Sequence, residues 1–492
     1  MLNRSFLALA GFGWLACSAQ QFNIRNDFQG FGQPEVTWGI EELGGQLLIY
    51  SGNADTTNTG WRTGFTRLTL DGAVLSEFSF GSVDISYYPG WSNTIDAREG
   101  LGIVACGSLD SSTMDRAVVW RFNSTGDSLW AVRLFEQEGY ESLGYAAHWV
   151  GDTAIAAVGM AVIPGSYAQV FLALLDTTGE VLWTRFYGGP NDDYGRSIDI
   201  APEGSIYVGG DTRSYSGPDA DDLLMKLDLD GDLLWMVTPG TSYDEASARV
   251  CATQDNGVVY VGASTEYMVG TLPYSRLLAR RYSPSGSLLW TKKYGPVRNV
   301  HELWSVKALP TGDFISCGTL MGPEYPHGCL LKFNADGDSL WMRSYTHPST
   351  DTTWSDWHDL RDVIATTNGG FAACGYLLSL GQDSWVIKVD SFGCLVPGCQ
   401  QFDNIAEQGI DLNILAYPNP TQGRLFLSFR SARSPQGEFT LLNSAGQVVQ
   451  RFQPGGASVE IDYDIGHHPS GMYLLRYEEQ GVVRWSQKVI KE

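Results

Sequence analysis

Residues 179–183 read GEVLW, and close variants of this pentapeptide recur along the chain. The copies are GDSLW (126–130), GEVLW (179–183), GDLLW (231–235), GSLLW (286–290) and GDSLW (337–341). Each copy places a tryptophan four residues after a glycine, and successive copies stand roughly 50 residues apart. A turn glycine repeated at a fixed period indicates a repeat architecture, in which every repeat folds as the same small unit.

Two sets of glycines count the repeats independently. Apolar segments such as SIYVGG (205–210) end at a glycine that occurs seven times, and the hairpin glycine of the pentapeptide also occurs seven times. The first set is Gly52, Gly107, Gly159, Gly210, Gly262, Gly318 and Gly375, and the second is Gly72, Gly126, Gly179, Gly231, Gly286, Gly337 and Gly393. Both sets predict seven repeats.

A single repeat has the pattern of four antiparallel strands. In one copy the strands are RSIDI (196–200), SIYVG (205–209), LLMKLDL (223–229) and DLLWMV (232–237). Alternation of apolar and polar residues, β-branched side chains and Asp-Gly turns all favour strands. Seven such units predict an all-β fold, a seven-bladed β-propeller over residues 20–400. A solenoid is the alternative, but a solenoid needs capping repeats, which a closed ring does not.

The two ends of the repeat region predict how the ring closes. Residues 22–28 (FNIRNDF) match the register of residues 182–188 (LWTRFYG), the outer strand of a complete repeat. The last repeat ends at CLVPGC (394–399), where Pro397 interrupts its outer strand. We therefore expect residues 22–28 to supply the outer strand of the last repeat, which also removes an exposed sheet edge.

The tryptophan-bearing repeat resembles the tryptophan-docking motif of several propeller families, in which an outer-strand indole packs on the neighbouring blade. ALLDTTGEVLW (173–183) matches that motif as it occurs in the pyrroloquinoline-quinone dehydrogenases. Those enzymes have eight blades and usually a vicinal cysteine pair, whereas this chain has seven repeats and no Cys-Cys. The resemblance therefore implies packing between blades by Trp183 and Trp235, and we expect no cofactor.

Composition and the N-terminus indicate an exported, acidic protein. Lys and Arg number 32 against 55 Asp and Glu, so the formal net charge is −23 and nucleic acid is not expected as a partner. Arg4, an apolar stretch over 6–16 and small residues before Gln20 predict a signal peptide over residues 1–19. Lipid attachment at Cys17 is the alternative. No later apolar run is long enough to predict a transmembrane helix.

The eight cysteines leave seven after removal of Cys17, so at least one is unpaired. Cys394 and Cys399 are candidates for a disulfide that closes a short loop, because export permits disulfides. Cys106, Cys317 and Cys374 each precede a repeat glycine where other repeats carry small residues. We expect these three to be small buried side chains rather than metal ligands.

After residue 400 the pattern changes. A polar linker, 401–414, leads to a module at 415–492 whose strands alternate as LFLSF, FTLLN, VVQRF, YLLRY and VVRWS. Turn residues between these strands predict a small Ig-like β-sandwich. The module resembles the type A C-terminal sorting domain of the type IX secretion system. The matching positions include Pro418, Asn419, Pro420, Gly423, Gly471, Tyr473 and Lys488.

This second resemblance implies where the protein is exported to, and it implies no molecular activity. Proteins with this domain pass through the outer membrane of Gram-negative bacteria, with the type IX secretion machinery as the partner. The domain is then removed, and the remainder is secreted or attached to the cell surface.

The loops predict one working face of the ring. Turns within the first and the last strand pair of each repeat are tight, so the long loops all emerge on the opposite face. Variable loops on a rigid scaffold are where recognition residues collect. Aromatic rings beside carboxylates suit a sugar ring or a cationic peptide, and packing between blades is the alternative role for each ring. The candidate residues are Trp91, Tyr140, Tyr194, Tyr243, Trp304, Trp357 and Asp359.

No catalytic, metal or phosphate-binding motif stands out in the sequence. The histidines lack paired ligand spacing, there is no Gly-x-Ser-x-Gly elbow, and the Asp-rich turn 228–232 lacks the downstream acid of an EF-hand. We therefore favour a non-catalytic propeller that binds a glycan or a protein. The alternative is a secreted hydrolase or lyase that uses carboxylates on the same face, such as Glu302 and Asp359.

Overall fold

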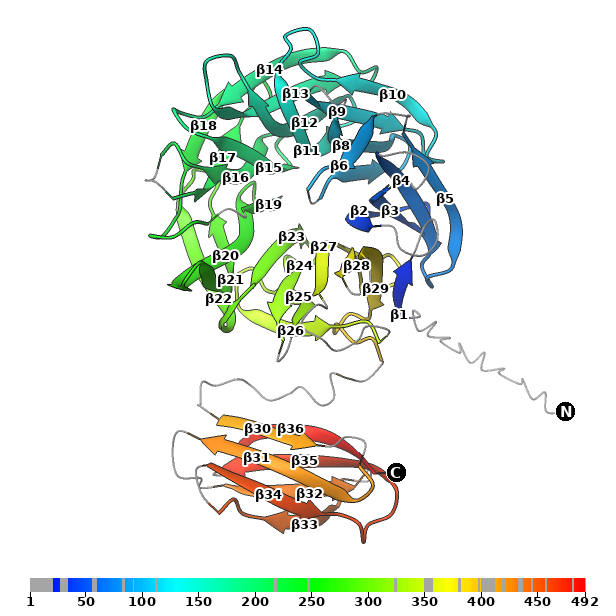
Figure 1. The fold of residues 1–492 in the computed structure, drawn as a ribbon, viewed down its shortest axis with the longest axis vertical. Helices are drawn as coiled ribbons and strands as arrows, with labels where there is room; N and C mark the ends of the chain where they lie inside the picture. The colour runs from blue at the N-terminus through cyan, green and yellow to red at the C-terminus, as the bar shows by residue number, and fades with distance from the viewer. Residues whose placement is uncertain are drawn as a thin grey trace, which may run out of the picture. The chain divides into compact units, whose positions relative to one another are not determined.

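Among the residues that the structure describes, seven antiparallel sheets follow one another along the first part of the chain and are arranged as a ring in the computed structural model (Figure 1). The structure describes residues 21–26, 34–54, 60–81, 85–91, 93–110, 114–215, 219–245, 248–322, 325–348, 357–378, 382–396, 399, 412–417, 421–431, 437–443, 446–455, 458–479 and 482–491. In the first six sheets the first strand lies nearest the axis of the ring and the last lies at its rim, whereas the N-terminal strand forms the rim of the seventh (Figure 1). This arrangement is a β-propeller, and each sheet corresponds to one predicted repeat.

The sheets are numbered here in chain order and their strands are given from the axis to the rim. Sheet 1 has β2 (Glu35–Leu43), β3 (Gln46–Ala54), β4 (Trp61–Thr69) and β5 (Val74–Phe80). Sheet 2 has β6 (Ser86–Pro89) and β7 (Ile95–Arg98) side by side along β8 (Gly102–Asp110), then β9 (Asp115–Phe122) and β10 (Ser128–Arg133). Sheet 3 has β11 (Glu141–Val150), β12 (Ala154–Val162), β13 (Ala168–Asp176) and β14 (Val181–Tyr187).

Four further sheets complete the series. Sheet 4 has β15 (Asp193–Ile200), β16 (Ile206–Thr212), β17 (Asp221–Leu227) and β18 (Leu233–Val237). Sheet 5 has β19 (Arg249–Ala252), β20 (Val258–Val269), β21 (Leu272–Tyr282) and β22 (Leu288–Asn299). Sheet 6 has β23 (Glu302–Ala308), β24 (Phe314–Met321), β25 (Pro326–Phe333) and β26 (Ser339–Tyr345). Sheet 7 has β27 (Trp357–Ala365), β28 (Phe371–Leu378), β29 (Gln382–Val389) and β1 (Phe22–Asn26).

The recurring tryptophans on sheets 2 to 6 join each of these sheets to the next, as the docking motif predicts. The indole N–H of Trp183, on β14, donates to the backbone oxygen of Leu229 in the last turn of sheet 4, at 3.1 Å. Trp130, Trp235 and Trp290 make the equivalent bond to the following sheet at 2.9–3.0 Å. The turn glycine is needed at this contact: a Cβ on Gly286 would lie 2.9 Å from the Trp235 ring, and its φ is +82°. These indoles are half-buried rather than fully buried.

The N-terminal strand closes the ring, as predicted. Strand β1 pairs antiparallel with β29, so it is the rim strand of sheet 7 (Figure 1). Asn23 accepts a bond from the buried Trp385 indole at 2.7 Å, and Arg25 forms an ion pair with Asp383. The expected register is wrong by one residue, because Phe22 pairs with Lys388 as Trp183 pairs with Leu174.

That one-residue shift has a packing reason. A slip by one residue turns every side chain of a strand to its other face. In the observed register Phe22 lies against the turn glycine Gly72 of sheet 1, where a Cβ would meet its ring at 2.7 Å. Phe22 therefore takes the place of the docking tryptophan at the closure. Residues 27 and 28 of the predicted strand lie outside the described residues.

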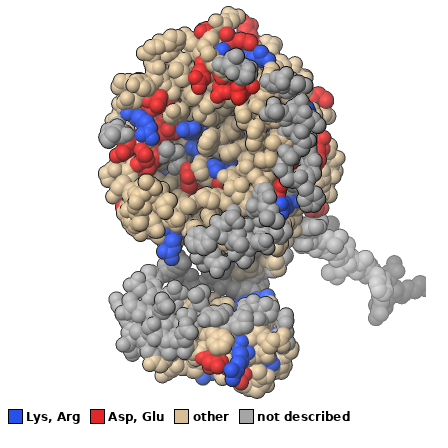
Figure 2. Space-filling model, viewed as in Figure 1, with Lys and Arg blue, Asp and Glu red and all other residues tan. Residues whose placement is uncertain are grey.

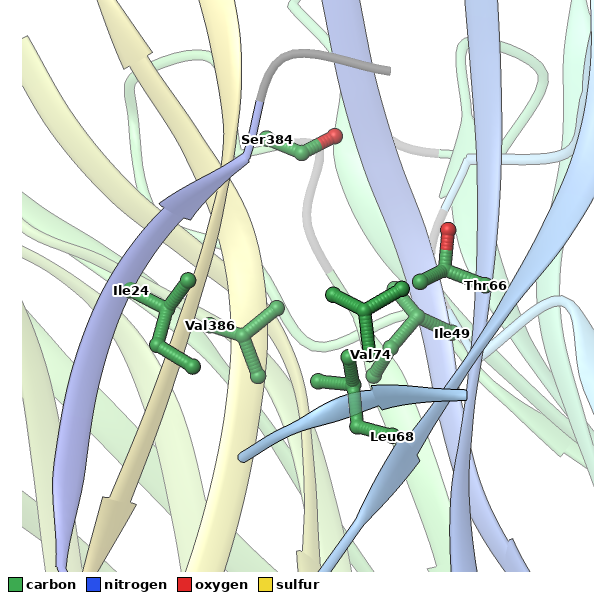
Figure 3. Close-up of a pocket in the computed structure, with 7 residues that line it drawn as sticks. All are labelled: Ile24, Ile49, Thr66, Leu68, Val74, Ser384 and Val386. Atoms are coloured by element: carbon green, nitrogen blue, oxygen red, sulfur yellow. The ribbon is translucent and has the colours of Figure 1, made fainter. Parts of the chain in front are cut away.

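The closure leaves a small apolar pocket between sheets 7 and 1 (Figure 3). Its lining comes from β1 and β29 of sheet 7 and from β3, β4 and β5 of sheet 1. The residues are Ile24, Ile49, Thr66, Leu68, Val74, Ser384 and Val386. Aliphatic side chains dominate this lining, so the pocket is a gap in the packing of the seam and offers no charged group to a ligand.

The chain divides into two compact units, Met1–Leu395 and Val396–Glu492. The expected end of the propeller at residue 400 thus lies five residues beyond the boundary of the first unit. Cys394 and Cys399 are both disulfide-bonded, whereas Cys106, Cys251, Cys317, Cys329 and Cys374 are free and buried. The signal peptide predicted over residues 1–19 lies outside the described residues. Within the described part, no helix is long and apolar enough to cross a membrane.

The second unit consists of two sheets with one shared core. One sheet has β30 (Leu412–Tyr417), β31 (Arg424–Ser431) and β34 (Ser458–Asp464), and the other has β33 (Val448–Phe452), β32 (Glu438–Asn443), β35 (Gly471–Glu479) and β36 (Val482–Lys491). Leu425 and Leu427 from the first sheet pack with Phe439, Leu441 and Leu475 from the second. The five strands predicted in this unit all form, and β30 and β34 are additional.

Candidate functional site

The strands nearest the axis carry an irregularity at the same place in five sheets. Each pairs with its neighbour in register, then skips one residue, which is a β-bulge. A bulge leaves one extra residue unpaired and turns its side chain away from the regular alternation. The five extra residues are Trp38, Tyr145, Arg196, Trp304 and Arg361. All five are aromatic or arginine.

A glycine on the second strand makes room for these bulges. A Cβ on Gly210 would lie 1.8 Å from the backbone oxygen of Tyr194, two residues before the extra Arg196. Gly159, Gly318 and Gly375 face the inner strand at 1.9–2.0 Å in the same way. We expected strands to end at these glycines, and that expectation is wrong, because Gly210 lies within β16 and Gly375 within β28. The repeat glycine marks close approach of two strands rather than a strand end.

The bulged side chains take part in a series of aromatic and cation–π contacts around the axis. The Arg361 guanidinium lies 3.7 Å from the ring centroid of Trp304, 5.0 Å from that of Trp38 and 5.4 Å from that of Tyr376. The Arg249 guanidinium lies 5.3 Å from the ring centroid of the same indole. Cation–π contacts of this length are attractive and are stronger where water is excluded.

The series continues through sheets 1 to 4. Trp38 and Trp91 lie 5.9 Å apart between ring centroids, and Trp91 and Tyr145 lie 6.3 Å apart. The Arg196 guanidinium then lies 5.4 Å from Trp91, 4.9 Å from Tyr145 and 4.5 Å from Tyr194. We call these residues the aromatic–arginine ring: Trp38, Trp91, Tyr145, Tyr194, Arg196, Arg249, Trp304, Arg361 and Tyr376.

The ring residues lie at the end of the axis that the long loops surround. Most of them follow closely on the segment that joins one sheet to the next, whereas Trp91 lies in the interruption between β6 and β7 and Tyr376 lies near the end of β28. Trp91 is 41% exposed, whereas Arg249 and Arg361 are 2% and 6% exposed. In Figure 2 basic and acidic side chains lie near the middle of the propeller face in view. The ring therefore offers accessible aromatic surface with buried cations behind it.

Two carboxylates hold two of the guanidiniums. Asp359 contacts Arg361 at 2.6 Å and also accepts a bond from the hydroxyl of Thr319 at 2.5 Å. Asp211 contacts Arg196 at 2.7 Å. All four charged residues are largely buried, which makes removal of one partner costly because the other charge is left without compensation.

A third carboxylate, that of Glu302, has a raised pKa. Burial raises the pKa of Glu302 to about 7, although Arg249 and Arg361 act in the opposite direction. Asp359 and Asp222 add to the increase by repulsion. Burial also lowers the pKa of Arg249 to about 10, and Glu302 is the largest opposing influence. Glu302 therefore changes its charge near neutral pH while Arg249 keeps its charge.

The structure brings together some of the predicted face residues and not others. Trp91, Tyr194 and Trp304 are members of the aromatic–arginine ring. Asp359 is 1% exposed and holds Arg361, so its carboxylate reaches a ligand only through that guanidinium.

The other three predicted residues lie apart from the aromatic–arginine ring. Tyr140 packs against Phe135 and Phe186 in the core between sheets 2 and 3. Tyr243 and Trp357 are half-buried and make no ring-to-ring contact among the described residues. The series of contacts around the axis includes Trp304 but not Trp357.

Sequence reasoning missed Trp38, Tyr145, Arg196, Arg249, Arg361 and Tyr376. The signal was present as a short repeated pattern before the second strand: TWGI (37–40), GYAA (144–147), GRSI (195–198), LWSV (303–306) and LRDV (360–363). The second position is always large and the third is always small or short and polar. Alignment of the repeats on the inner strands would have shown it.

A separate polar cluster lies deeper along the axis. Lys307 contacts Glu41 at 3.4 Å and donates to the side-chain oxygen of Asn93 at 2.5 Å. Burial raises the pKa of Glu41 to about 7, with Lys307 acting against the increase. These groups bond to one another across sheets 1, 2 and 6, which is the arrangement of a structural network. Among the described residues, no group of three or more His, Cys, Asp or Glu side chains is placed to hold a metal ion.

In the second unit several predicted sorting positions have clear structural roles. Gly423 has a φ of +122° and approaches Gly466, where a Cβ would lie 2.8 Å from its Cα. The Tyr473 hydroxyl donates to the backbone oxygen of Pro469 at 2.6 Å, and its ring is in the core. Gly471 has a φ of +152°, and Lys488 is exposed. Pro418, Asn419 and Pro420 lie outside the described residues.

Comparison with protein families identifies the C-terminal unit. Residues 415–492 match the secretion system C-terminal sorting domain, over the range expected from the sequence. The protein is thus a β-propeller protein with a type IX sorting domain. This domain indicates secretion by the type IX system to the cell surface or beyond.

Among curated proteins, the chain is similar to the regulatory protein FlaEY of Caulobacter vibrioides, with 28% identity over 155 residues. That match covers 27% of this chain and 16% of the relative, so the chain spans only a small part of the relative's length.

Solved propellers of similar fold share little sequence. The WD40 domain of Neurospora crassa Pan2 is 13% identical with a TM-score of 0.42, over 73% of this chain and 89% of that one. The propeller domain of the Trilobed protease from Pyrococcus furiosus is 10% identical with a TM-score of 0.41, over 75% and 99%. PorZ, a surface component of the type IX system of Porphyromonas gingivalis, is 9% identical with a TM-score of 0.31, over 92% and 74%.

Proposed function

We propose that this protein is a non-catalytic glycan-binding propeller that works at the cell surface or outside the cell. The supporting observation is the aromatic–arginine ring, to which all seven sheets contribute at one end of the axis. Residues placed by β-bulges on a rigid scaffold are held in fixed positions, which suits recognition. The accessible part of the ring is aromatic, with Trp91 41% exposed.

Sugars fit this surface better than the other ligands that the sequence left open. The apolar face of a sugar ring packs on an indole, and its hydroxyls bond to polar groups at the edge. A cationic peptide suits the ring poorly, because Arg196, Arg249 and Arg361 lie directly behind the aromatic surface and repel it.

Hydrolysis by paired carboxylates is the weaker alternative. Glu302 has the raised pKa that a general acid needs. Its natural partner would be Asp359, but that carboxylate is 1% exposed and already bonded to Arg361 and Thr319. A buried carboxylate held in this way is poorly placed to attack a sugar or to activate water.

A glycan array probed with the full chain tests the proposed function. Binding to a defined set of sugars without release of new reducing ends is the expected result. The test variant is Trp91→Ala, which removes the most exposed indole of the aromatic–arginine ring. It should weaken glycan capture at least tenfold, since a hot-spot aromatic contributes about 2 kcal/mol or more to binding. Capture that is unchanged in Trp91→Ala, or steady release of reducing ends, would contradict the proposal.

For the export route, we propose that residues 1–19 are a cleaved leader and that 415–492 are removed after passage through the outer membrane of a Gram-negative bacterium. The remainder then stays at the surface or is released. Deletion of 415–492 should leave the propeller in the periplasm with its melting transition unchanged, because residues up to 395 form their own compact unit. Cell fractionation and a thermal melt check the two parts, and surface exposure of the truncated chain would refute the first.

A further inference from the structure

The second hairpin of sheet 5 is longer than its counterpart in sheet 4. Strand β20 has 12 residues where β16 has 7, and the two strands begin at the same place in the repeat, at Val258 and Ile206. The additional residues therefore all lie at the far end of β20, where they lengthen the hairpin by about 17 Å at roughly 3.3 Å per residue. Pairing with β21 continues to the last pair, Val269 with Leu272, across a two-residue turn.

This hairpin extends from the end of the propeller that carries the aromatic–arginine ring. Arg249, a member of that ring, pairs with Val261 on β20, and β20 continues beyond this pair to Val269. We call residues 267–274 the hairpin tip. The tip therefore lies beyond the aromatic–arginine ring along the direction of the strand.

The side chains of the hairpin tip are uncharged and largely apolar. The sequence of the tip is YMVGTLPY (267–274). Its exposed large apolar side chains are Tyr267, Met268, Val269 and Leu272. The rings of Tyr267 and Tyr274 stack across the two strands with centroids 5.0 Å apart, which holds the tip together. A gathering of exposed apolar side chains on an ordered projection marks a surface that contacts a partner.

Positive charge lies at the base of the hairpin tip. Residues 267–301 contain six Lys and Arg and no Asp or Glu, in a chain with a net charge of −23. Arg276 on β21 and the exposed Arg298 on β22 lie on neighbouring strands. Among the described residues neither arginine forms an ion pair, whereas Lys293 pairs with Glu266 at 2.7 Å. The base of the tip therefore carries two positive charges without a carboxylate partner.

We propose that the hairpin tip inserts into an anionic lipid surface, with its apolar side chains at the boundary of headgroups and acyl chains and Arg276 and Arg298 against the phosphates. This binding is independent of glycan binding by the aromatic–arginine ring. An apolar segment flanked by cations gains from burial of its apolar area and from attraction to anionic headgroups. Cross-strand pairing satisfies the backbone groups that face each other in the tip, and these bonds persist when water is removed.

A lipid surface suits the hairpin tip better than a protein partner does. A stable protein interface buries about 800 Å² on each side, which a tip of eight residues supplies only if a groove encloses it. A lipid surface accepts a convex projection without a preformed site. The C-terminal sorting domain indicates export to the cell surface or beyond, where a lipid surface is within reach.

The acidic remainder of the chain does not prevent this contact. Anionic lipid repels a chain of net charge −23. Repulsion between exposed charges is largely screened beyond about 10 Å at 0.1 M salt. The hairpin extends by more than this distance, so its two arginines reach the headgroups while most acidic side chains stay outside the screening length.

The experiment is flotation of the full chain with vesicles of phosphatidylcholine, alone or with about one third phosphatidylglycerol. The parent should bind the anionic vesicles at least tenfold more tightly, since each arginine near the surface contributes about a factor of five. The double variant Val269→Ser, Leu272→Ser should lose most binding to both kinds of vesicle. Its matched control is Leu288→Ser, Leu289→Ser at the opposite end of sheet 5, where exposures of 53% and 52% equal those of Val269 and Leu272.

A second pair of variants tests the charge. Arg298→Glu should weaken binding to the anionic vesicles about tenfold or more and leave binding to neutral vesicles unchanged. Arg185→Glu makes the same charge change at an exposed arginine on the rim of sheet 3 and should bind as the parent does.

Each other outcome overturns a defined part of the proposal. Equal binding of the parent to both kinds of vesicle overturns the role of the arginines. Absence of binding, or an equal loss in the Leu288, Leu289 control, overturns the lipid site at the hairpin tip. Dimerisation of the parent that the tip variant abolishes assigns the tip to a second copy of the chain instead. If the tip variant fails to melt cooperatively, the comparison of Arg298→Glu with Arg185→Glu decides.

Discussion

Tryptophans at the rim of the propeller and tryptophans at its axis follow opposite rules. At the rim, Trp130, Trp183, Trp235 and Trp290 each donate their indole N–H to a backbone oxygen of the next sheet. At the axis, the Trp304 indole N–H is buried and has no partner among the described residues, and its ring centroid lies 3.7 and 5.3 Å from the guanidiniums of Arg361 and Arg249. The same residue type therefore completes packing at the rim and presents a surface at the axis.

The glycines next to the rim tryptophans also differ from the glycines next to the axial residues. Rim glycines such as Gly286 adopt a positive φ to receive the indole of the preceding sheet. Axial glycines such as Gly375 do not, but they allow an inner strand to approach so closely that it bulges. A periodic sequence thus encodes two different contacts, one that joins blades and one that positions the ring residues.

The largest expected effect is on an axial glycine. Gly375→Ala places a Cβ 1.9 Å from the backbone oxygen of Asp359, so the bulge that holds Arg361 must shift. We expect a loss of about 3 kcal/mol or more in the free energy of unfolding, measured by denaturant titration. Gly60→Ala is the control, since its nearest neighbour would be the Ser86 hydroxyl at 3.3 Å. Equal stability of the two variants would mean that the close approach is not needed.

The next largest effect is expected from removal of a whole indole, which should lower the free energy of unfolding more at the rim than at the axis. The rim indoles are half-buried, so Trp183→Ala should cost about 2–3 kcal/mol, below the 3–5 kcal/mol of a fully buried tryptophan. Trp304→Ala should cost less, because the stack that it leaves is bounded by guanidiniums that retain their ion pairs or can take up water. Thermal melts of both variants measure the difference, and a larger loss for Trp304→Ala would make that indole a packing residue.

Trp→Phe substitution gives the smallest and most selective effect. Phenylalanine keeps an aromatic ring but has no N–H, so Trp183→Phe and Trp235→Phe each lose one bond to a backbone oxygen. Each should lose about 1 kcal/mol on that account. Trp304→Phe has no such bond to lose and should stay closer to the parent. Equal losses at the two places would indicate that the N–H plays no part in the difference.

The local sequence pattern was sufficient to predict the blades but not the aromatic–arginine ring. The turn glycines, the docking tryptophans and the closing strand are all visible in sequence because each follows the period of the repeat. The one-residue error at Phe22 arose because register depends on which face of the strand meets Gly72, and only the packed seam decides that. Six members of the aromatic–arginine ring were missed because members were sought among long loops, whereas bulges place Trp38, Tyr145, Arg196 and Arg361 on the inner strands.

Asp359 illustrates a second reason why the sequence alone did not predict the site. Its position in the sequence marks it as an acid on the working face, but its role depends on Arg361, two residues along the same strand, and on Thr319 from the neighbouring sheet. Pairing between side chains of neighbouring sheets is a property of the folded ring. No spacing rule in a single repeat could have supplied it.

The measurement that tests the account most directly is sugar binding by Trp304→Ala and Trp183→Ala, each compared with the parent at a temperature where all three are folded. The account predicts that Trp304→Ala loses capture of the array sugars while Trp183→Ala binds as the parent does. Equal binding by both variants, or loss in Trp183→Ala alone, would contradict the claim that the axis of this propeller is its recognition site.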